Sequence, residues 1–195
     1  MDWIDETGDT IESLPRQEIR RRNLLHRVTA SFVFHPDGRL LVHRRTETKD
    51  VYPGFYDVAV GGTVVTGETF AANACRELNE ELGIDSPVLY HLFSHRFQDS
   101  WSNSLTKVFA TLSTGPFRLQ PEEVSEGDWM DIERVRTLTG SGRVCPDSTQ
   151  AWRLYQEQCA REGSLEERIR SGRLQPVACG AAAREGHDRL SARNR

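Results

Sequence analysis

The segment from Glu68 to Leu82 limits the possible folds of this 195-residue chain more than any other part of the sequence. Its large or small apolar residues recur every four positions, at Phe70, Ala74, Leu78 and Leu82. Residues at this spacing form one stripe of an α-helix, and such a stripe can face a core. Gly83 follows directly and is a natural helix terminator. The segment therefore predicts an amphipathic helix that packs on a folded domain.

Three glutamates lie beside that stripe. Glu77, Glu80 and Glu81 are three or four residues apart, so they share one side of the helix. Like charges at this spacing destabilise a helix by a few tenths of a kcal/mol per pair. Arg76 can offset part of this repulsion, but a divalent cation would offset more, and oxygen donors favour magnesium or manganese over zinc. Taken alone, the three carboxylates also fit an ordinary charged helix face.

Other segments predict strands and helices that interleave without a regular βαβ rhythm. We expect an α/β (α+β) fold in which a mixed β-sheet is sandwiched between helices, with an N-terminal β-hairpin extension. The expected elements are a hairpin over 3–12, a helix over 15–23 capped by Ser13, a hairpin formed by 28–34 and 40–43, strands over 57–60, 88–93, 105–112 and near Trp129, and helices over 131–137 and 148–161.

The chain length fits one domain with extensions. We expect a hairpin and helix extension over 1–25, the main domain over 26–163, and a tail over 164–195. The tail is rich in arginine, glycine and alanine and has few large apolar residues, so it is predicted to be flexible.

Composition excludes several classes of protein. The 37% hydrophobic and 28% charged residues are typical of a globular chain, and no apolar run approaches the roughly 18 residues of a membrane-spanning helix. A net charge of −4 argues against a general nucleic-acid binder. The acidic N-terminus lacks the pattern of a secretory signal. We therefore expect a cytoplasmic monomer or homodimer that acts on a small molecule and binds neither nucleic acid nor membrane.

The four cysteines are Cys75, Cys145, Cys159 and Cys179. They are scattered, without a CxxC pair and without a histidine at zinc-finger spacing. This pattern predicts reduced, structural thiols and neither a disulfide nor a zinc site.

The glutamates belong to a longer pattern that begins at Gly62 and reads GTVVTGETFAANACRELNEELGI. Glu68 follows Gly62 after five residues, and Arg76-Glu77 follows after seven more. This pattern resembles the complete signature of the Nudix hydrolases, with every fixed position filled. The resemblance implies a Nudix fold and hydrolysis of a pyrophosphate bond in a nucleoside diphosphate derivative or nucleotide, with Mg²⁺ or Mn²⁺ as the cofactor.

The resemblance also implies roles for individual residues. Glu80 and Glu81 are the expected principal metal ligands, and Glu77 is a ligand or base. Gly62 is expected to offer its backbone carbonyl to a cation, and Arg76 to form a buried link to Glu68. The expected catalytic residues are Glu77, Arg76 and Glu80. Many members of the family use a further acidic residue on a later loop, for which the spacing leaves two candidates open, Glu123 and Glu126.

Similarity extends from about Leu14 to Gln158 and is to the isopentenyl-diphosphate-isomerase-like branch of the family. HRRTETKDVYPGFYDVAVGG before the signature and EVSEGDWM after it carry this likeness. The isomerases have a cysteine and a histidine where this chain has Val60 and Gly62, so isomerisation is the less favoured alternative. A non-catalytic nucleotide sensor is another alternative, but the region after Arg161 looks too short for the DNA-binding module that such a regulator would need.

Basic and aromatic residues precede the signature. Arg44, Arg45 and Lys49 are expected to bind substrate phosphates, because guanidinium groups match phosphate geometry. The alternative is a charged edge strand and loop. Four aromatic residues could stack on a base, although packing is their commoner role: Tyr52, Phe55, Tyr56 and Trp101.

Overall fold

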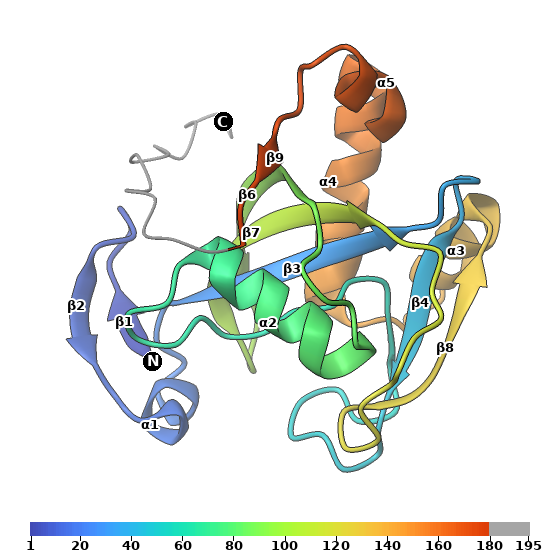
Figure 1. The fold of residues 1–195 in the computed structure, drawn as a ribbon. Helices are drawn as coiled ribbons and strands as arrows, with labels where there is room; N and C mark the ends of the chain where they lie inside the picture. The colour runs from blue at the N-terminus through green and yellow to red at the C-terminus, as the bar shows by residue number, and fades with distance from the viewer. Residues whose placement is uncertain (180–195) are drawn as a thin grey trace.

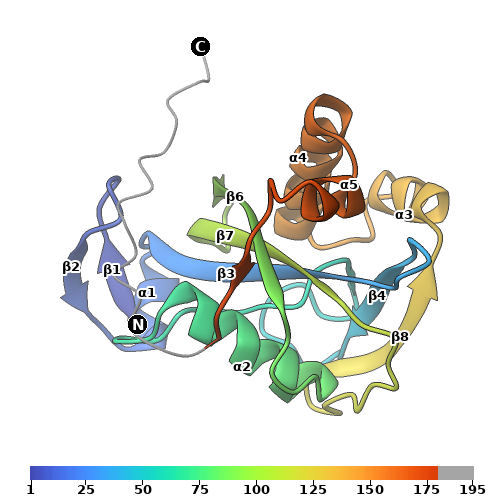
Figure 2. The ribbon, with the colours of Figure 1, turned by 45° about the horizontal axis from the view of Figure 1, so that its top comes forward.

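The computed structural model describes residues 1–179 and contains a mixed seven-stranded sheet between two layers of helices (Figures 1 and 2). Helix α2 (Phe70–Leu82) covers one face, and three C-terminal helices lie on the other side. The strands are β3 (His26–Phe34), β4 (Leu40–Arg45), β5 (Tyr56–Asp57), β6 (Leu89–Gln98), β7 (Asn103–Leu112), β8 (Val124–Met130) and β9 (Pro176–Val177). The three helices are α3 (Ile132–Thr139), α4 (Pro146–Glu162) and α5 (Leu165–Arg170). Within residues 1–179 no helix is long and apolar enough to cross a membrane.

The path through the sheet is β5-β4-β3-β7-β6-β9, and β8 pairs with β4. Strands β3 and β7 are parallel, whereas the other pairs are antiparallel. Strand β4 meets β3 only at Phe34↔Leu40. Nearer the start of β3, the segment that contains the double glycine takes the neighbouring place, through bridges Ser31↔Val60 and Val28↔Thr63. This divergence positions the glycines beside the middle of the central strand.

Side chains of β3 point alternately into two cores. Phe32 and Phe34 pack against Trp152 and Tyr155 of α4. Val33 points to the opposite face, into the core that α2 covers. This alternation is the period of two that a strand with both faces buried requires.

Helix α2 confirms the expectation drawn from its apolar stripe, all of which is buried: Phe70, Ala74, Leu78 and Leu82. The helix begins at Phe70, because the Thr69 hydroxyl accepts the Ala72 N–H at 3.1 Å and caps the first turn. It ends at Gly83, whose φ of 71° is left-handed. Glu68 therefore lies just before the helix and not in its first turn.

The N-terminal extension forms the expected hairpin and helix. Strands β1 (Asp2–Ile4) and β2 (Thr10–Ser13) pair, and α1 (Arg16–Arg21) follows. Ser13 does not cap this helix, which corrects our expectation. It ends β2, where its hydroxyl donates to Asp2 at 2.7 Å, and Pro15 precedes the helix without a side-chain cap.

The segment over 164–179 is structured, in contrast to the flexible tail expected from composition. A capping box between Ser164 and Glu167 starts α5, and Leu165 and Leu174 are buried in the core beside α4. Strand β9 then pairs with β6. The rest of the expected tail, 180–195, lies outside the described residues.

The cysteines correct a third expectation. Cys75 of α2 and Cys179, just after β9, form a disulfide across a sequence separation of 104 residues. Cys145 and Cys159 are free thiols. Spacing did not reveal the bridge, because only tertiary folding brings Cys75 close to Cys179.

Candidate functional site

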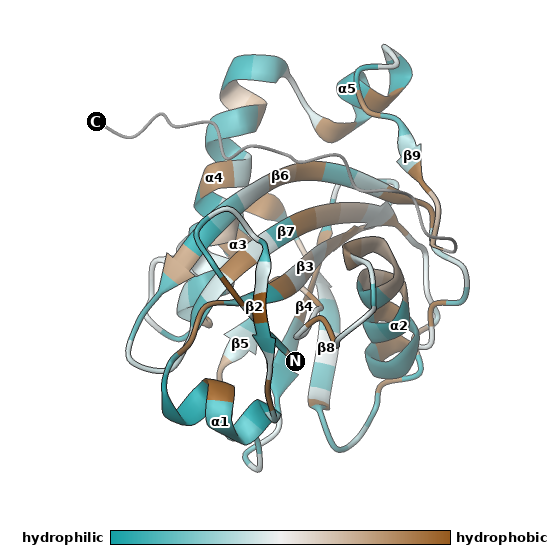
Figure 3. Ribbon diagram, turned by 90° about the vertical axis from the view of Figure 1, so that its left-hand side faces the viewer, coloured by the Kyte–Doolittle hydropathy of each residue, from teal (hydrophilic) through white to brown (hydrophobic). Residues whose placement is uncertain are grey.

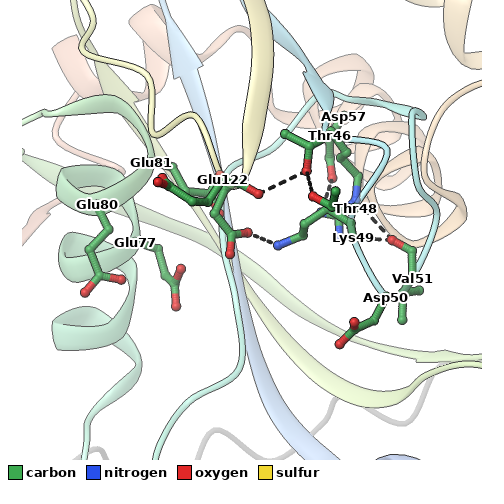
Figure 4. Close-up of polar contacts among 12 residues, drawn as sticks. Thr46, Thr48, Lys49, Asp50, Val51, Asp57, Glu77, Glu80, Glu81 and Glu122 are labelled. Carbon is green, nitrogen blue, oxygen red and sulfur yellow. Dashed lines mark hydrogen bonds and ion pairs between the residues drawn. The ribbon is translucent and has the colours of Figure 1, made fainter.

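A cavity of about 460 Å³ opens between α2, the middle of β3 and the loop that joins β4 to β5. Glu77 and Glu81 of α2 lie on one wall, and Arg45 and Lys49 on another. Figure 4 shows the glutamates of α2 facing the loop that carries Lys49. An acidic wall therefore faces a basic wall across the cavity.

Gly61 and Gly62 are each closely approached by another part of the chain. A Cβ atom on Gly61 would lie 1.9 Å from the Thr29 carbonyl oxygen, and one on Gly62 would lie 2.5 Å from Glu77 Oε1. The Gly62 carbonyl accepts the Thr29 N–H at 2.9 Å. Glycine at these positions lets the loop lie directly on β3 and leaves room for the Glu77 carboxylate.

Asn73 fastens this loop to α2. It is fully buried, and its Oδ1 accepts the Thr29 hydroxyl at 2.5 Å. Its Nδ2 donates to the Thr63 carbonyl at 3.0 Å and to Glu68 Oε2 at 2.9 Å. Asn73 carries no signal in the sequence, because it occupies a variable position of the signature and its partners are distant in the chain.

Arg76 joins the acidic residues as expected. Its guanidinium donates to both oxygens of Glu68, at 3.0 and 3.2 Å. Its Nη1 also lies 2.9 Å from Glu77 Oε1 and 2.8 Å from Glu80 Oε2. These carboxylates raise the pKa of Arg76, so the guanidinium stays charged and offsets part of the repulsion among the glutamates.

Glu81 and Glu77 are desolvated carboxyl groups. Burial, followed by the charges of Glu77 and Asp57, raises the pKa of Glu81 to about 8. Burial is also the main cause that raises the pKa of Glu77, although Arg76 opposes it. His43 Nε2 lies 3.9 Å from Glu81, but burial lowers the pKa of His43 and so favours its neutral form. Glu81 therefore has no strong cationic partner beside it among residues 1–179.

The basic wall is held by the β4–β5 loop. Arg45 donates to the Val51 carbonyl at 3.0 and 3.2 Å, and Lys49 forms an ion pair with Glu123. Burial and the charge of Arg45 lower the pKa of Lys49. Asp57 lies 3.9 Å from Arg45 on the cavity floor. The wall is thus preorganised by backbone and carboxylate acceptors.

Other expected site residues lie away from the cavity lining. Glu80 is half-exposed and paired with Arg76. Arg44 donates to the Gly54 carbonyl and to Glu47. Glu126 is exposed on β8, opposite Arg44, whereas Glu123 lines the cavity. The geometry therefore favours Glu123 over Glu126.

Several lining residues had no signal in the sequence. Asp57 and Asp147 lie at the cavity floor, and burial raises the pKa of Asp147 to about 6. His26 lines the cavity from the start of β3, and Arg16 and Arg20 reach it from α1. The run Arg20-Arg21-Arg22, taken alone, fits a solvated helix face. Only the spacing of four residues, which puts Arg16 and Arg20 on one side, hinted at a shared role.

The donor set fits a divalent cation with oxygen ligands. Two desolvated carboxylates with raised pKa values, Glu77 and Glu81, lie where the loop glycines leave space, and carboxylate oxygens suit magnesium or manganese. Residues 1–179 contain no ready-made group of three or more histidine, cysteine or acidic ligands. This does not oppose Mg²⁺, which usually keeps several water ligands and takes one or two carboxylates.

The NUDIX domain family matches residues 24–147, well over half of the chain. The chain belongs to the Nudix hydrolase family. An uncharacterized Nudix hydrolase of Pseudomonas aeruginosa is 44% identical over 153 residues, which are 78% of this chain and 90% of that protein. The uncharacterized Nudix hydrolase YfcD of Escherichia coli K12 is 34% identical over 168 residues, covering 85% and 92% of the two chains.

Solved structures agree with this family. A crystal structure of a Deinococcus radiodurans protein, DR0079, has a TM-score of 0.70 at 27% identity and covers 78% of this chain and 96% of its own. The MutT protein of Methanosarcina mazei has a TM-score of 0.59 at 22% identity, covering 72% and 96%, and shows the fold alone. Membership implies pyrophosphohydrolase activity in general, and Nudix hydrolases generally use divalent metals such as Mg²⁺.

Proposed function

We propose that this protein is a Mg²⁺- or Mn²⁺-dependent diphosphohydrolase that cleaves a pyrophosphate bond in a nucleoside diphosphate derivative or nucleotide. The observation that carries the proposal is the buried carboxylate of Glu81 beside the largely desolvated carboxylate of Glu77, opposite Arg45 and Lys49 in one cavity. An acidic wall suits cations, and a basic wall suits the phosphates that the cations would bridge.

Each wall has its own role. Glu77 and Glu81 would hold the metal, with the Gly62 carbonyl beside them, and Glu80 would join them only by leaving Arg76. When bound, the metal lowers the pKa of a coordinated water and neutralises charge on the phosphates. Arg45 and Lys49 orient the pyrophosphate, and Arg76 keeps Glu77 in place. Glu123 holds Lys49 and is the candidate assisting acid from the later loop.

The isomerase alternative has less support. Moving an alkene proton needs an acid and a base at the site. Val60 stands where the isomerases have a cysteine, and its side chain is buried in the core beneath α2. The position offers no proton donor, whereas the glutamates needed for hydrolysis are all present.

A substrate panel tests the proposed activity. Release of phosphate or mononucleotide is measured from nucleoside triphosphates and nucleoside diphosphate derivatives, with magnesium and with manganese. We expect metal-dependent turnover of at least one compound by the wild type and a loss of at least a hundredfold in Glu81→Gln. Equal rates for the wild type and this variant on every compound would remove the hydrolase proposal. Conversion of isopentenyl diphosphate to its isomer would replace it.

We place the enzyme in the cytoplasm, where nucleotides are abundant, as a monomer or homodimer. The Cys75–Cys179 disulfide is unusual for that compartment. Fractionation of the native host tests the location, and recovery of the protein mainly outside the cytoplasm would contradict it.

A further inference from the structure

A second cavity of about 640 Å³ adjoins the catalytic one. The two share four lining residues, Arg16 and Arg20 from α1, Val51 from the β4–β5 loop, and Trp101 from the turn between β6 and β7. A molecule whose pyrophosphate lies between the acidic and basic walls can therefore continue into this outer compartment. None of the roles proposed above uses it.

The outer compartment is basic. Arg16 and Arg20 are one turn apart on α1, a helix that is largely hydrophilic in Figure 3. Burial, followed by the charge of Arg16, lowers the pKa of Arg20, so the two guanidinium groups repel each other. Arg20 lies 3.3 Å from Asp50, an exposed carboxylate, and Arg16 forms no ion pair within residues 1–179. An anion between the two arginines would relieve this repulsion.

An exposed aromatic ring lies beside these arginines. Trp101 is 61% exposed, one of the largest apolar exposures in residues 1–179. Its backbone is nevertheless fixed, because Asp99 Oδ1 accepts the N–H groups of Trp101 and Ser102, both at 2.7 Å. The other Asp99 oxygen accepts the Tyr52 hydroxyl. The indole is thus an open flat surface on a pinned turn, which is how proteins present aromatic rings to bases.

We propose that the outer compartment binds a phosphorylated nucleoside, whose base stacks on Trp101 and whose phosphate pairs with Arg16 and Arg20. The inference rests on the proposed hydrolase function and narrows its substrate class. The preferred substrates carry a nucleoside with at least one phosphate on its sugar, in addition to the pyrophosphate that is cleaved. Prenyl diphosphates lack both groups, and simple nucleoside triphosphates lack the additional phosphate at the sugar.

Binding to metal-free protein tests the compartment without turnover. Adenosine 3′,5′-bisphosphate, AMP and ribose 5-phosphate are titrated in EDTA by calorimetry and by tryptophan fluorescence. We expect the bisphosphate to bind more tightly than AMP, and AMP more tightly than ribose 5-phosphate. Trp101→Leu weakens both adenosine compounds by roughly tenfold or more, abolishes most of the fluorescence change and leaves ribose 5-phosphate unaffected, whereas Trp101→Phe retains stacking.

The arginines have a control residue directly after the same helix. Arg16→Gln/Arg20→Gln removes the advantage of the bisphosphate over AMP, whereas Arg22→Gln does not, because Arg22 lies over the Trp3 ring and lines neither cavity. Unchanged affinities in Trp101→Leu, or an equal loss for all three probes, would overturn the proposal. Equal effects of Arg22→Gln and the double variant would do so as well.

Hydrolysis separates this proposal from the proposed function. Binding that depends on Trp101 in a chain that cleaves no pyrophosphate would support the compartment and remove the hydrolase. Metal-dependent hydrolysis of a nucleoside diphosphate derivative that carries a 3′-phosphate on its ribose, with the same kcat/KM in wild type and Trp101→Leu, would support the hydrolase and overturn the compartment.

Discussion

Glu81 combines burial, a raised pKa and a position at the cavity wall, and no other acidic side chain of α2 has all three to the same degree. Its side chain is 9% exposed, against 14% for Glu77 and 49% for Glu80. A carboxyl group so placed stays protonated near neutral pH unless a cation replaces the proton. Metal binding and proton release are therefore coupled at this residue.

Stability of the metal-free protein should depend on pH through Glu81. Its pKa is about 8 in the folded protein, against an ordinary glutamate value of 4.5. A carboxyl group whose pKa is raised by folding stabilises the fold fully at pH values below its pKa in the unfolded chain. This contribution is lost as the pH rises through its pKa in the folded protein. We expect the unfolding temperature of the wild type in EDTA to fall, relative to Glu81→Gln, between pH 5 and pH 8. Parallel curves for the two proteins would contradict this.

Adding Mn²⁺ at pH 8 should reverse that loss in the wild type and have a much smaller effect in Glu81→Gln, because the ion replaces the proton as the partner of the carboxylate. Thermal unfolding with increasing Mn²⁺ measures the difference. Equal stabilisation of both proteins would place the metal away from Glu81.

Substitution of Gly61 and of Gly62 by alanine should have different effects, one on stability and the other on activity. In Gly61→Ala the new Cβ meets the Thr29 backbone, so we expect destabilisation by about 1–3 kcal/mol, measured by urea unfolding. In Gly62→Ala it meets the mobile end of the Glu77 side chain, so we expect near-normal stability but at least tenfold lower activity. The same loss of stability in both variants would show that Gly62 serves the fold and not the site.

At the scale of elements, α2 is tied to distant parts of the chain. Its N-terminal half is joined to the double-glycine loop through Asn73 and to the segment after β9 through Cys75–Cys179. Because Arg76 follows Cys75 directly, the disulfide fastens the helix next to the residue that gathers the glutamates.

Breaking the disulfide should lower the free energy of unfolding. Cys179→Ser is expected to cost about 2–4 kcal/mol, because the bridge closes a loop across 104 residues and restricts the unfolded chain. Cys159→Ser, which removes a free thiol, is the matched control. Urea unfolding without reductant measures both variants, and the wild type in dithiothreitol should resemble Cys179→Ser. A wild-type midpoint that does not respond to dithiothreitol would contradict the expectation.

The elements that sequence predicted well are those with local signals. The stripe of α2 and Gly83 define a helix from within its own segment, and the turn at 36–38 defines the hairpin of β3 and β4. Helix α5 and β9 were missed because they are short and are stabilised by distant partners, such as the core around Leu165 and Leu174. The prediction that Ser13 caps α1 was wrong, because the Ser13 hydroxyl donates to Asp2 instead.

The candidate site also contains residues that local sequence signals predict and residues that they do not. The glutamates and Arg76 lie within one helix turn or two, so a linear motif identifies them. Asp57, Asp147 and Arg20 reach the cavity from three separate elements, and only the folded chain brings them together. Sequence spacing carries no information on such contacts.

At the scale of the whole molecule, the cavity exists because β4 leaves β3 after one residue pair. The space between them is taken by the double-glycine loop, and α2 closes one side while α1 and the β6–β7 turn close another (Figure 1). This arrangement sets an acidic wall opposite a basic wall, with Trp101 at the border of the outer compartment. A molecule that joins a pyrophosphate to a nucleoside matches that arrangement.

The most direct measurement compares pyrophosphate hydrolysis by the wild type, Glu81→Gln and Glu133→Gln, with Mg²⁺, with Mn²⁺ and in EDTA. Glu133 is an exposed glutamate of α3 that pairs with Arg136, so its variant removes the same charge outside the site. We predict that the wild type and Glu133→Gln turn over a nucleoside diphosphate derivative only with metal, and that Glu81→Gln is at least a hundredfold slower. Turnover in EDTA, or equal rates for all three proteins, would contradict the assignment of Glu81 to the metal.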